Sequence, residues 1–281
     1  MLWGEVIGKT AHYLEGKGVA GAQTAAELLA ARLLKTGRGF LGGFALKEAP
    51  EPFLEAMRRG MARLAAGEPV QYVIGEWDFR RLTLKCDRRA LIPRPETEEL
   101  VSLVLKSLKG GEVLIDVGTG TGAIVLSLAQ EAPSPKLLIG TDVSEDAIAL
   151  ARENAERTGL GDKVELLAMD GLEEFDEPQF VDVIVSNPPY IRSADIATLS
   201  PQVRDFEPRL ALDGGENGLD FYERYLGDAL NLLKPGGRVF FEIGEDQGEP
   251  VRELMASFGF SAVEIGRDFA GHERYASAVL E

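Results

Sequence analysis

The chain has 281 residues, of which 45% are apolar, enough for about two globular domains with substantial cores. Its 46 acidic and 30 basic side chains give a formal net charge of −16, which opposes binding to nucleic acid and to anionic membranes. The single cysteine excludes an internal disulfide framework, and the two histidines leave too few soft ligands for a zinc cluster. With no signal peptide or long apolar run, we expect a cytoplasmic protein without a metal, and we take a monomer as the default.

The first 70 residues are predicted to form a small helical domain. Apolar residues recur there with helical spacing, at Ala26, Leu29, Leu33 and Leu34 and again at Phe53, Met57, Met61 and Leu64. From Tyr72 to Ile92 the pattern changes to short apolar runs bounded by Gly75 and by charged residues. Residues 71–95 are therefore predicted to be a β-hairpin connector.

Residues 96–281 are predicted to form an α/β domain with a Rossmann-like parallel sheet, because short apolar strands alternate with helical segments. Buried strands are expected at Val113–Val117, Leu137–Thr141, Val164–Ala168, Val181–Ser186 and Arg238–Ile243. Helices are expected at Ala123–Glu131, Ser144–Thr158, Phe221–Leu233 and Gln247–Phe258, with Ser144 as an N-cap. Two edge strands, Ala262–Ile265 and Tyr275–Leu280, bring the predicted sheet to seven strands.

A glycine-rich turn follows the first predicted strand and opens a helix. It consists of Gly118, Thr119, Gly120, Thr121 and Gly122, a composition that lets a ligand approach the backbone closely. Together with Ala123, the same spacing satisfies the permissive dinucleotide pattern. The turn alone therefore leaves a nicotinamide cofactor, S-adenosylmethionine and a ligand-free turn all open.

Acidic residues at the ends of the first three strands favour the methyl donor. Asp116 would oppose a pyrophosphate but suits the cationic amino acid end of S-adenosylmethionine. Asp142, about 20 residues beyond the glycine turn, can accept hydrogen bonds from ribose hydroxyls, although a helix-dipole role is the alternative. Asp170 and Gly171 end the third strand, where an adenine amino group would lie; an ordinary loop acid is an equal alternative there.

The fourth strand ends in Asn187-Pro188-Pro189-Tyr190, at the carboxyl edge where open α/β sheets bind ligands. The two prolines make the loop rigid and poor in donors. We predict that the Asn187 side-chain oxygen and the Pro188 carbonyl accept both hydrogens of a planar NH₂ group, and that Tyr190 packs against it. The nitrogen lone pair would then face the methyl carbon. The alternative is a stiff structural loop with Tyr190 in the core.

A planar NH₂ group occurs both in glutamine and in adenine, so a DNA adenine methyltransferase is a second hypothesis. That enzyme must extrude a base and contact phosphates, for which a charge of −16 without a basic run is poorly suited. A nicotinamide oxidoreductase leaves the proline loop unexplained. A purely binding protein leaves both the loop and the glycine turn unexplained.

With these motifs, the chain resembles the release-factor glutamine methyltransferases, the PrmC/HemK family, over nearly its whole length. The resemblance also includes stretches distant from the glycine turn. These are Gly67–Gly75, Ile92-Pro93-Arg94-Pro95-Glu96-Thr97-Glu98, Phe206-Glu207-Pro208, Ala211–Gly215, Gly218–Asp220, Phe241-Glu242-Ile243-Gly244, and Asp268–Gly271 with Arg274. We expect Arg94 and Glu98 to brace the connector and assign them no chemistry.

The resemblance implies methyl transfer from S-adenosylmethionine, leaving S-adenosylhomocysteine, to the side-chain amide of the glutamine in the Gly-Gly-Gln motif of class 1 peptide release factors. It implies a seven-stranded methyltransferase domain behind a helical domain that helps to hold the protein substrate. By matching positions, Gly118–Gly122, Asp142, Asp170, Gly171 and Asn187 would line the cofactor site, and Asn187–Tyr190 would hold the glutamine. A glutamine of a large-subunit ribosomal protein is the alternative substrate.

Overall fold

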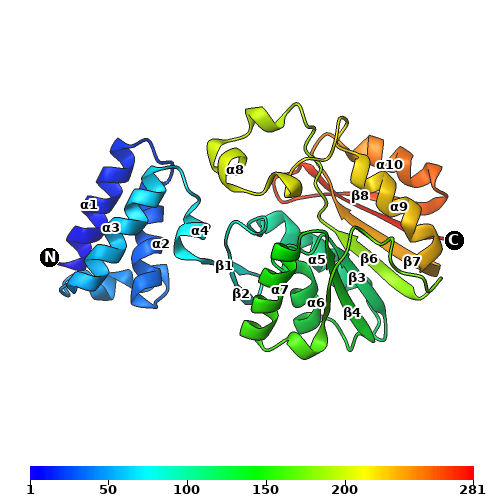
Figure 1. Ribbon diagram of the computed structural model, residues 1–281, viewed down its shortest axis with the longest axis horizontal. Coiled ribbons are helices and arrows are strands. Elements are labelled where there is room, and N and C mark those ends of the chain that lie inside the picture. The colour runs from blue at the N-terminus through cyan, green and yellow to red at the C-terminus, as the bar shows by residue number, and fades with distance from the viewer. The chain divides into compact units, whose positions relative to one another are not determined.

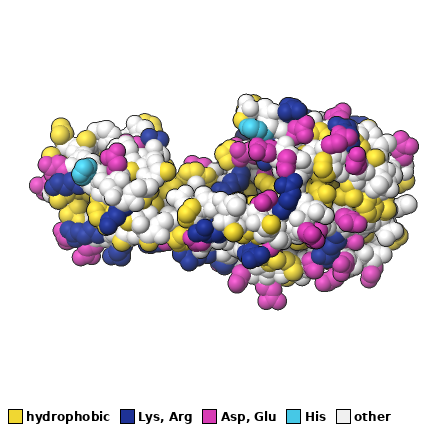
Figure 2. Space-filling view, turned by 90° about the horizontal axis from the view of Figure 1, so that it is seen from above, with side chains coloured by type: hydrophobic (Ala, Val, Ile, Leu, Met, Phe, Trp, Pro, Cys, Tyr) yellow, Lys and Arg dark blue, Asp and Glu magenta, His cyan; other side chains and the backbone are white.

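The computed structural model describes all 281 residues, and the chain divides into two compact units. The smaller unit comprises residues 1–76 and 200–206, and the larger one residues 77–199 and 207–281. The acidic excess lies in the larger unit, which holds 37 of the 46 acidic side chains and 20 of the 30 basic ones, and Figure 2 shows acidic side chains on its surface. No helix has the length and apolar character needed to cross a membrane.

The smaller unit is helical, as predicted. Its elements are α1 (Trp3–Gly16), α2 (Ala22–Leu34), a 3-10 segment (Arg38–Phe44), α3 (Glu51–Ala65), α4 (Val70–Ile74) and α8 (Pro201–Phe206). The core contains residues predicted from helical spacing, among them Ala26, Leu29, Met57 and Leu64, all nearly inaccessible to solvent. They pack with Trp3, which α1 contributes. The apolar stripes of α1, α2 and α3 are thus buried against one another.

The prediction of strand structure from Tyr72 onward is wrong at its start, because Val70–Ile74 forms the short helix α4. Two arginines on neighbouring helices stabilise it. Arg63 donates to the main-chain oxygens of Tyr72 and Val73, and Arg32 donates to that of Ile74. Carbonyls at a helix end lack partners within the helix, so these side-chain donors satisfy groups that the local sequence pattern does not reveal.

The larger unit begins within the hairpin of β1 (Glu76–Phe79) and β2 (Leu82–Lys85), and it continues with a seven-stranded sheet. The sheet order is β5-β4-β3-β6-β7-β9-β8, and the first five strands are parallel. The strands are β3 (Val113–Val117), β4 (Leu137–Asp142), β5 (Glu165–Ala168), β6 (Val181–Ser186), β7 (Leu233–Glu242), β8 (Phe260–Arg267) and β9 (Glu273–Leu280). The predicted α/β fold with seven strands is confirmed.

Helices cover both faces of this sheet (Figure 1), and each face has its own core. One face carries α5 (Pro95–Ser107), α6 (Ala123–Glu131) and α7 (Glu145–Thr158), and the other carries α9 (Asp220–Leu232) and α10 (Gly248–Ser257). Successive residues of a strand enter opposite cores: Leu114 joins the first and Ile115 the second. Burial on both faces explains why the central strands are continuous apolar runs.

The ends of the sheet differ from the prediction in one respect. The last strand, β9, pairs with both β7 and β8, so only β8 is an edge strand on that side. The predicted N-cap is confirmed, because Ser144 Oγ accepts a hydrogen bond from the Ala147 amide at the start of α7. Helix α5 was not among the predicted helices, and it contributes a residue to the site described below.

Candidate active site

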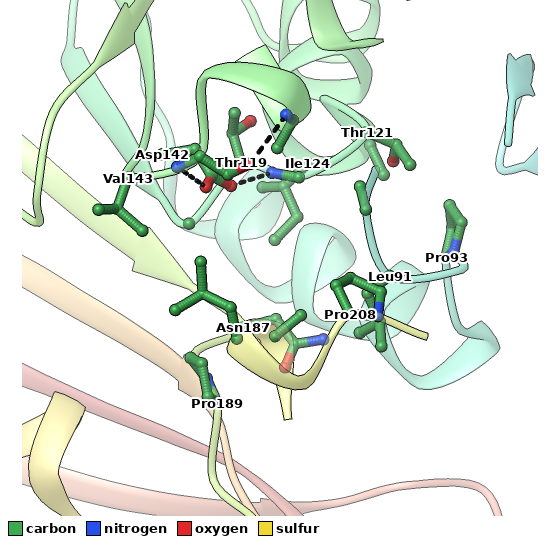
Figure 3. Close-up of a pocket in the computed structure, with 18 of the residues that line it drawn as sticks. Leu91, Pro93, Thr119, Thr121, Ile124, Asp142, Val143, Asn187, Pro189 and Pro208 are labelled. Atoms are coloured by element: carbon green, nitrogen blue, oxygen red, sulfur yellow. Dashed lines mark hydrogen bonds between the residues drawn. The ribbon is translucent and has the colours of Figure 1, made fainter. Parts of the chain in front are cut away.

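A cavity lies at the carboxyl ends of the parallel strands of the larger unit. The glycine turn after β3, Asp142 at the end of β4 and Asn187 after β6 all line it. Figure 3 shows Asp142 and Thr119 at one end of the cavity and Asn187 and Pro189 at the other. Of the predicted site residues, the lining contains Gly118, Thr119, Gly120, Thr121, Asp142, Asp170, Gly171, Asn187 and Pro189. Gly122, Pro188 and Tyr190 are outside it.

The glycine turn depends on backbone conformations that favour glycine. Gly118, Gly120 and Gly122 have φ angles of 73°, 57° and 82°, in the left-handed region. The Thr119 amide donates to the Thr141 carbonyl at 2.8 Å, which fixes the turn beside β4. These contacts hold the turn in shape and leave its backbone facing the cavity.

Asp142 organises the turn and faces the cavity at the same time. Its Oδ2 accepts the Gly120 amide and its Oδ1 accepts the Ser144 amide, both at 2.9 Å (Figure 3). Burial raises the pKa of this carboxyl, and the two amide hydrogen bonds oppose the shift. Because each carboxylate oxygen has a further acceptor position, Asp142 keeps the capacity to accept two hydroxyl hydrogens.

Asp116 is placed differently from the sequence-based interpretation, which put it beside a cationic ligand. It is fully buried, it does not line the cavity, and its Oδ2 accepts from Thr119 Oγ1 at 2.6 Å and from the Val125 amide at 3.2 Å. Burial raises its pKa to about 7, while those hydrogen bonds oppose the shift. Asp116 therefore braces the glycine turn against α6.

Asp170 and Gly171 line the cavity, but Asp170 is also half of an exposed ion pair. Arg224 Nη1 donates to Asp170 Oδ1 at 2.7 Å, and Arg224 Nη2 donates to the Asp170 carbonyl at 2.8 Å. The Gly171 carbonyl in turn accepts from Thr141 Oγ1. The turn after β5 is thus fixed from two sides beside the cavity.

Asn187 follows a buried anchor and is itself oriented by a hydrogen bond. Ser186 Oγ donates to the Val117 carbonyl at 2.6 Å, which ties the end of β6 to β3. Asn187 Nδ2 donates to Thr97 Oγ1 at 3.1 Å, and no group of the protein donates to Asn187 Oδ1. The amide nitrogen is therefore occupied, and the oxygen is left to accept.

Tyr190 is not among the residues that line this cavity. Its ring packs against the buried cluster that contains Tyr222 and Phe241, and burial raises the pKa of its hydroxyl. Gln247 Nε2 donates to the Tyr190 carbonyl at 3.0 Å. An aromatic ring gains more from burial in this core than from exposure in the cavity, so Tyr190 anchors the loop from beneath.

One wall of the cavity comes from a segment for which the sequence predicts no role in the site. Leu91, Pro93 and Arg94, from the segment between the hairpin and α5, line it. Arg94 Nη2 donates to Glu207 Oε1, and Glu207 Oε2 accepts the Ile92 amide at 3.1 Å. This buried carboxylate joins two loops beside the cavity. The available signal was that both residues lie in stretches that resemble the family.

Apolar side chains complete the cavity between its two polar ends. Ile124, Val143, Phe221 and Tyr225 are among the lining residues. A largely apolar cavity with a few placed acceptors is typical of sites for small organic cofactors. The cavity has the Asp142 carboxylate at one end and the Asn187 amide oxygen at the other. It therefore suits a ligand whose ribose lies at the Asp142 end, with an NH₂ group reacting at the Asn187 end.

Two family descriptions match the chain: a methyltransferase domain over residues 108–258 and a PrmC N-terminal domain over residues 5–75. A release factor glutamine methyltransferase of Geobacter sulfurreducens is 38% identical over 96% of the chain and 94% of its own length. The chain belongs to the release factor glutamine methyltransferases. A second member, from Agrobacterium fabrum, is 42% identical over 75% of this chain and 74% of its own.

A solved structure has a fold similar to that of this family member. A methyltransferase from Pyrococcus furiosus matches 70% of the chain and 88% of its own length, with a TM-score of 0.53 and 25% identity. The family membership makes the chain a methyltransferase and excludes the nicotinamide oxidoreductase and the purely binding protein as interpretations. The glycine turn and Asn187, which line one cavity, both lie within the part of the chain that matches the methyltransferase domain.

Proposed function

We propose that the protein transfers a methyl group from S-adenosylmethionine to the side-chain amide nitrogen of the glutamine in the Gly-Gly-Gln motif of class 1 peptide release factors. The observation that carries the proposal is the Asn187 amide, whose nitrogen is held by Thr97 and whose oxygen is left to accept a hydrogen from a substrate NH₂ group. The names of the relatives, release factor glutamine methyltransferases, support the same substrate.

The residues of the cavity fit the methyl donor. Asp142 would accept the ribose hydroxyls, the turn Gly118–Gly122 would approach the amino acid end, and Asp170 with Gly171 would meet the adenine edge. Val143 offers an exposed apolar side chain, 49% accessible, for a flat ring. When bound, S-adenosylmethionine supplies an electrophilic methyl carbon and leaves as S-adenosylhomocysteine.

The protein's task is to orient a poor nucleophile. An amide nitrogen shares its lone pair with the carbonyl, so its two hydrogens must be held to direct that lone pair. Asn187 Oδ1 would accept one hydrogen and the Pro188 carbonyl the other, while Pro188 and Pro189 keep the loop rigid. Such orientation can contribute roughly 7–11 kcal/mol in favourable cases. A strong base is not needed first, because the nitrogen becomes acidic only as it is methylated.

The three parts of the chain would have separate roles. We assign residues 1–70 to recognition of the protein substrate, residues 71–95 to the connector and residues 96–281 to cofactor binding and methyl transfer. The match of residues 5–75 to a PrmC N-terminal domain supports the first assignment. The cavity, formed wholly by residues of the larger unit, supports the last.

The charge of the larger unit disfavours a DNA substrate, and the names of the relatives favour a release factor over a ribosomal protein. A DNA adenine target would place phosphates against the larger unit, where the acidic residues are concentrated. A large-subunit ribosomal protein glutamine would use the same Asn187 chemistry, but the relatives are named for release factors. Both alternatives are outcomes of the same experiment.

In that experiment the enzyme is incubated with labelled S-adenosylmethionine and, in separate reactions, a class 1 release factor, a large-subunit ribosomal protein fraction or duplex DNA. We expect label in the release factor and none in a release factor whose Gly-Gly-Gln glutamine is replaced by alanine. Label in DNA or in ribosomal protein, with none in the release factor, would overturn the proposal.

A further inference from the structure

A chain of hydrogen bonds extends from Asn187 through Thr97, which also lines the cavity, to the buried Glu242. Asn187 Nδ2 donates to Thr97 Oγ1 at 3.1 Å, and Thr97 Oγ1 donates to Glu242 Oε2 at 2.6 Å. Thr97 is 4% exposed and Glu242 is 2% exposed, so the contact between these two side chains is shielded from water. Thr97 and Glu242 come from two sequence stretches to which the proposed methyl transfer has so far given no role.

The fold brings these three residues together from distant parts of the chain. Strands β6 and β7 are parallel neighbours in which Ser186 pairs with Phe241, so the next residues, Asn187 and Glu242, follow side by side at the carboxyl edge. Thr97 lies in the first turn of α5, which packs against β7. The Tyr275 hydroxyl, from β9, donates to the Glu96 carbonyl at 2.8 Å and fixes that turn.

The chain of contacts has a direction. A carboxylate only accepts, so the ionised Glu242 receives the Thr97 hydroxyl hydrogen. The hydroxyl oxygen is then left to accept, and only the NH₂ end of the Asn187 amide can satisfy it. The reversed amide would place two acceptors, Asn187 Oδ1 and Thr97 Oγ1, against each other.

We propose that Thr97 and Glu242 are positioning residues that hold the Asn187 amide with its oxygen toward the substrate glutamine. This inference rests on the proposed function, because it explains how that site distinguishes an NH₂ donor from an acceptor. An Asn187 amide turned by half a rotation would present its own NH₂ group to the substrate NH₂ group. Two donors would then face each other, and the glutamine nitrogen would lose its orientation.

Thr97→Val tests the inference, since valine keeps the shape of threonine and removes the hydroxyl. We expect kcat for release factor methylation to fall about tenfold or more, with KM for the release factor and Kd for S-adenosylmethionine changed less than about twofold. Thr97→Ser restores the hydroxyl and should recover most of kcat. The matched control is Thr158→Val, which removes a hydroxyl bonded to the Asn154 carbonyl at the end of α7 and should leave kcat unchanged.

A second measurement keeps the inference separate from the choice of substrate. In nitrogen-15 NMR spectra of the enzyme with S-adenosylmethionine alone, the Asn187 side-chain signals, assigned by their absence in Asn187→Ala, should shift in Thr97→Val and return in Thr97→Ser. Unchanged signals, or equal loss of kcat in both Thr97 variants, would overturn the positioning role. An unmethylated release factor with the expected signal shifts would instead overturn only the proposed function.

Discussion

The Asn187 amide nitrogen is engaged by Thr97, and in the proposed function its oxygen accepts a hydrogen bond from the substrate. Truncation of this side chain should therefore affect chemistry more than binding. We predict that Asn187→Ala lowers the rate of methyl transfer about a hundredfold or more, because the substrate nitrogen loses its alignment. Affinity for S-adenosylmethionine, measured by calorimetry, should stay within about threefold of the parent. An activity within twofold of the parent would contradict the assigned role.

Asp142 should matter mainly for cofactor affinity. In Asp142→Ala the ribose would lose two hydrogen bonds to the carboxylate, and hydrogen bonds to a charged group contribute roughly 1.5–3 kcal/mol each. We predict a Kd for S-adenosylmethionine raised at least about tenfold. Asp182→Ala is the matched control. Asp182 also accepts a hydrogen bond from a backbone amide, that of Val113, but it lies at the amino end of β6, away from the carboxyl ends where the cavity lies. An equal effect of both variants would argue against the ribose contact.

Several site residues were predictable because they directly follow strands that the apolar pattern reveals. Asp142 and Asn187 are of this kind, and parallel strands bring their carboxyl ends to one edge. The role of Thr97 was not predictable, since it depends on a hydrogen bond between residues 90 positions apart in the sequence. For Tyr190 the sequence left open whether the ring packs against the substrate or in the core, because the motif does not show which neighbours compete for the ring.

The loop Asn187–Tyr190 is an element whose shape depends on the segment beneath it. Gly218 has a φ of +72°, and a Cβ atom there would lie 2.4 Å from the Tyr190 carbonyl oxygen and 2.7 Å from Gln247 Nε2. We predict that Gly218→Ala lowers methyl transfer more than about tenfold, because the carbonyl must move and the loop with it. The enzyme assay is to be run on protein that still binds S-adenosylmethionine.

Gly236→Ala provides the comparison for that variant. Gly236 has a similar φ of +80°, but no atom lies within 4 Å of the position of its Cβ. The Gly236→Ala substitution should therefore introduce only backbone strain, which lowers folding stability by about 1–3 kcal/mol, and should leave kcat unchanged. If both glycine variants lose activity equally, the effect is one of strain and not of the loop.

At the level of elements, the buried strands were more predictable than the short helices. The β3 strand was predicted at Val113–Val117 and found there, because a fully buried strand is a compact apolar run. Helix α4 was predicted as strand structure because five residues show little period, and its stability comes from Arg32 and Arg63 on other helices. Tertiary contacts of that kind leave no local signal.

For the whole molecule, buried carboxyl groups make stability depend on pH. Burial raises the pKa of Asp116 from its usual 3.8 to about 7, so between these values the folded state binds more protons than the unfolded state. The free energy of unfolding therefore falls as pH rises through this window, by at most about 1.4 kcal/mol per pH unit from this group. Above pH 7 its contribution is constant.

Asp116→Asn isolates this contribution, because an amide oxygen can still accept from Thr119 and Val125. Relative to the parent, the variant should gain stability between about pH 4 and pH 7, as measured by denaturant unfolding without cofactor. A stability difference that does not change with pH would show that Asp116 ionises normally in the folded protein.

The most direct test of methyl transfer to glutamine is peptide mass spectrometry of a class 1 release factor after incubation with the enzyme and S-adenosylmethionine. We expect the mass of one added methylene on the Gly-Gly-Gln peptide, with fragment ions that locate it on the glutamine side chain. The same peptide should stay unmodified with Asn187→Ala. A methyl group on any other residue, or an unmodified peptide with the parent enzyme, would contradict the account.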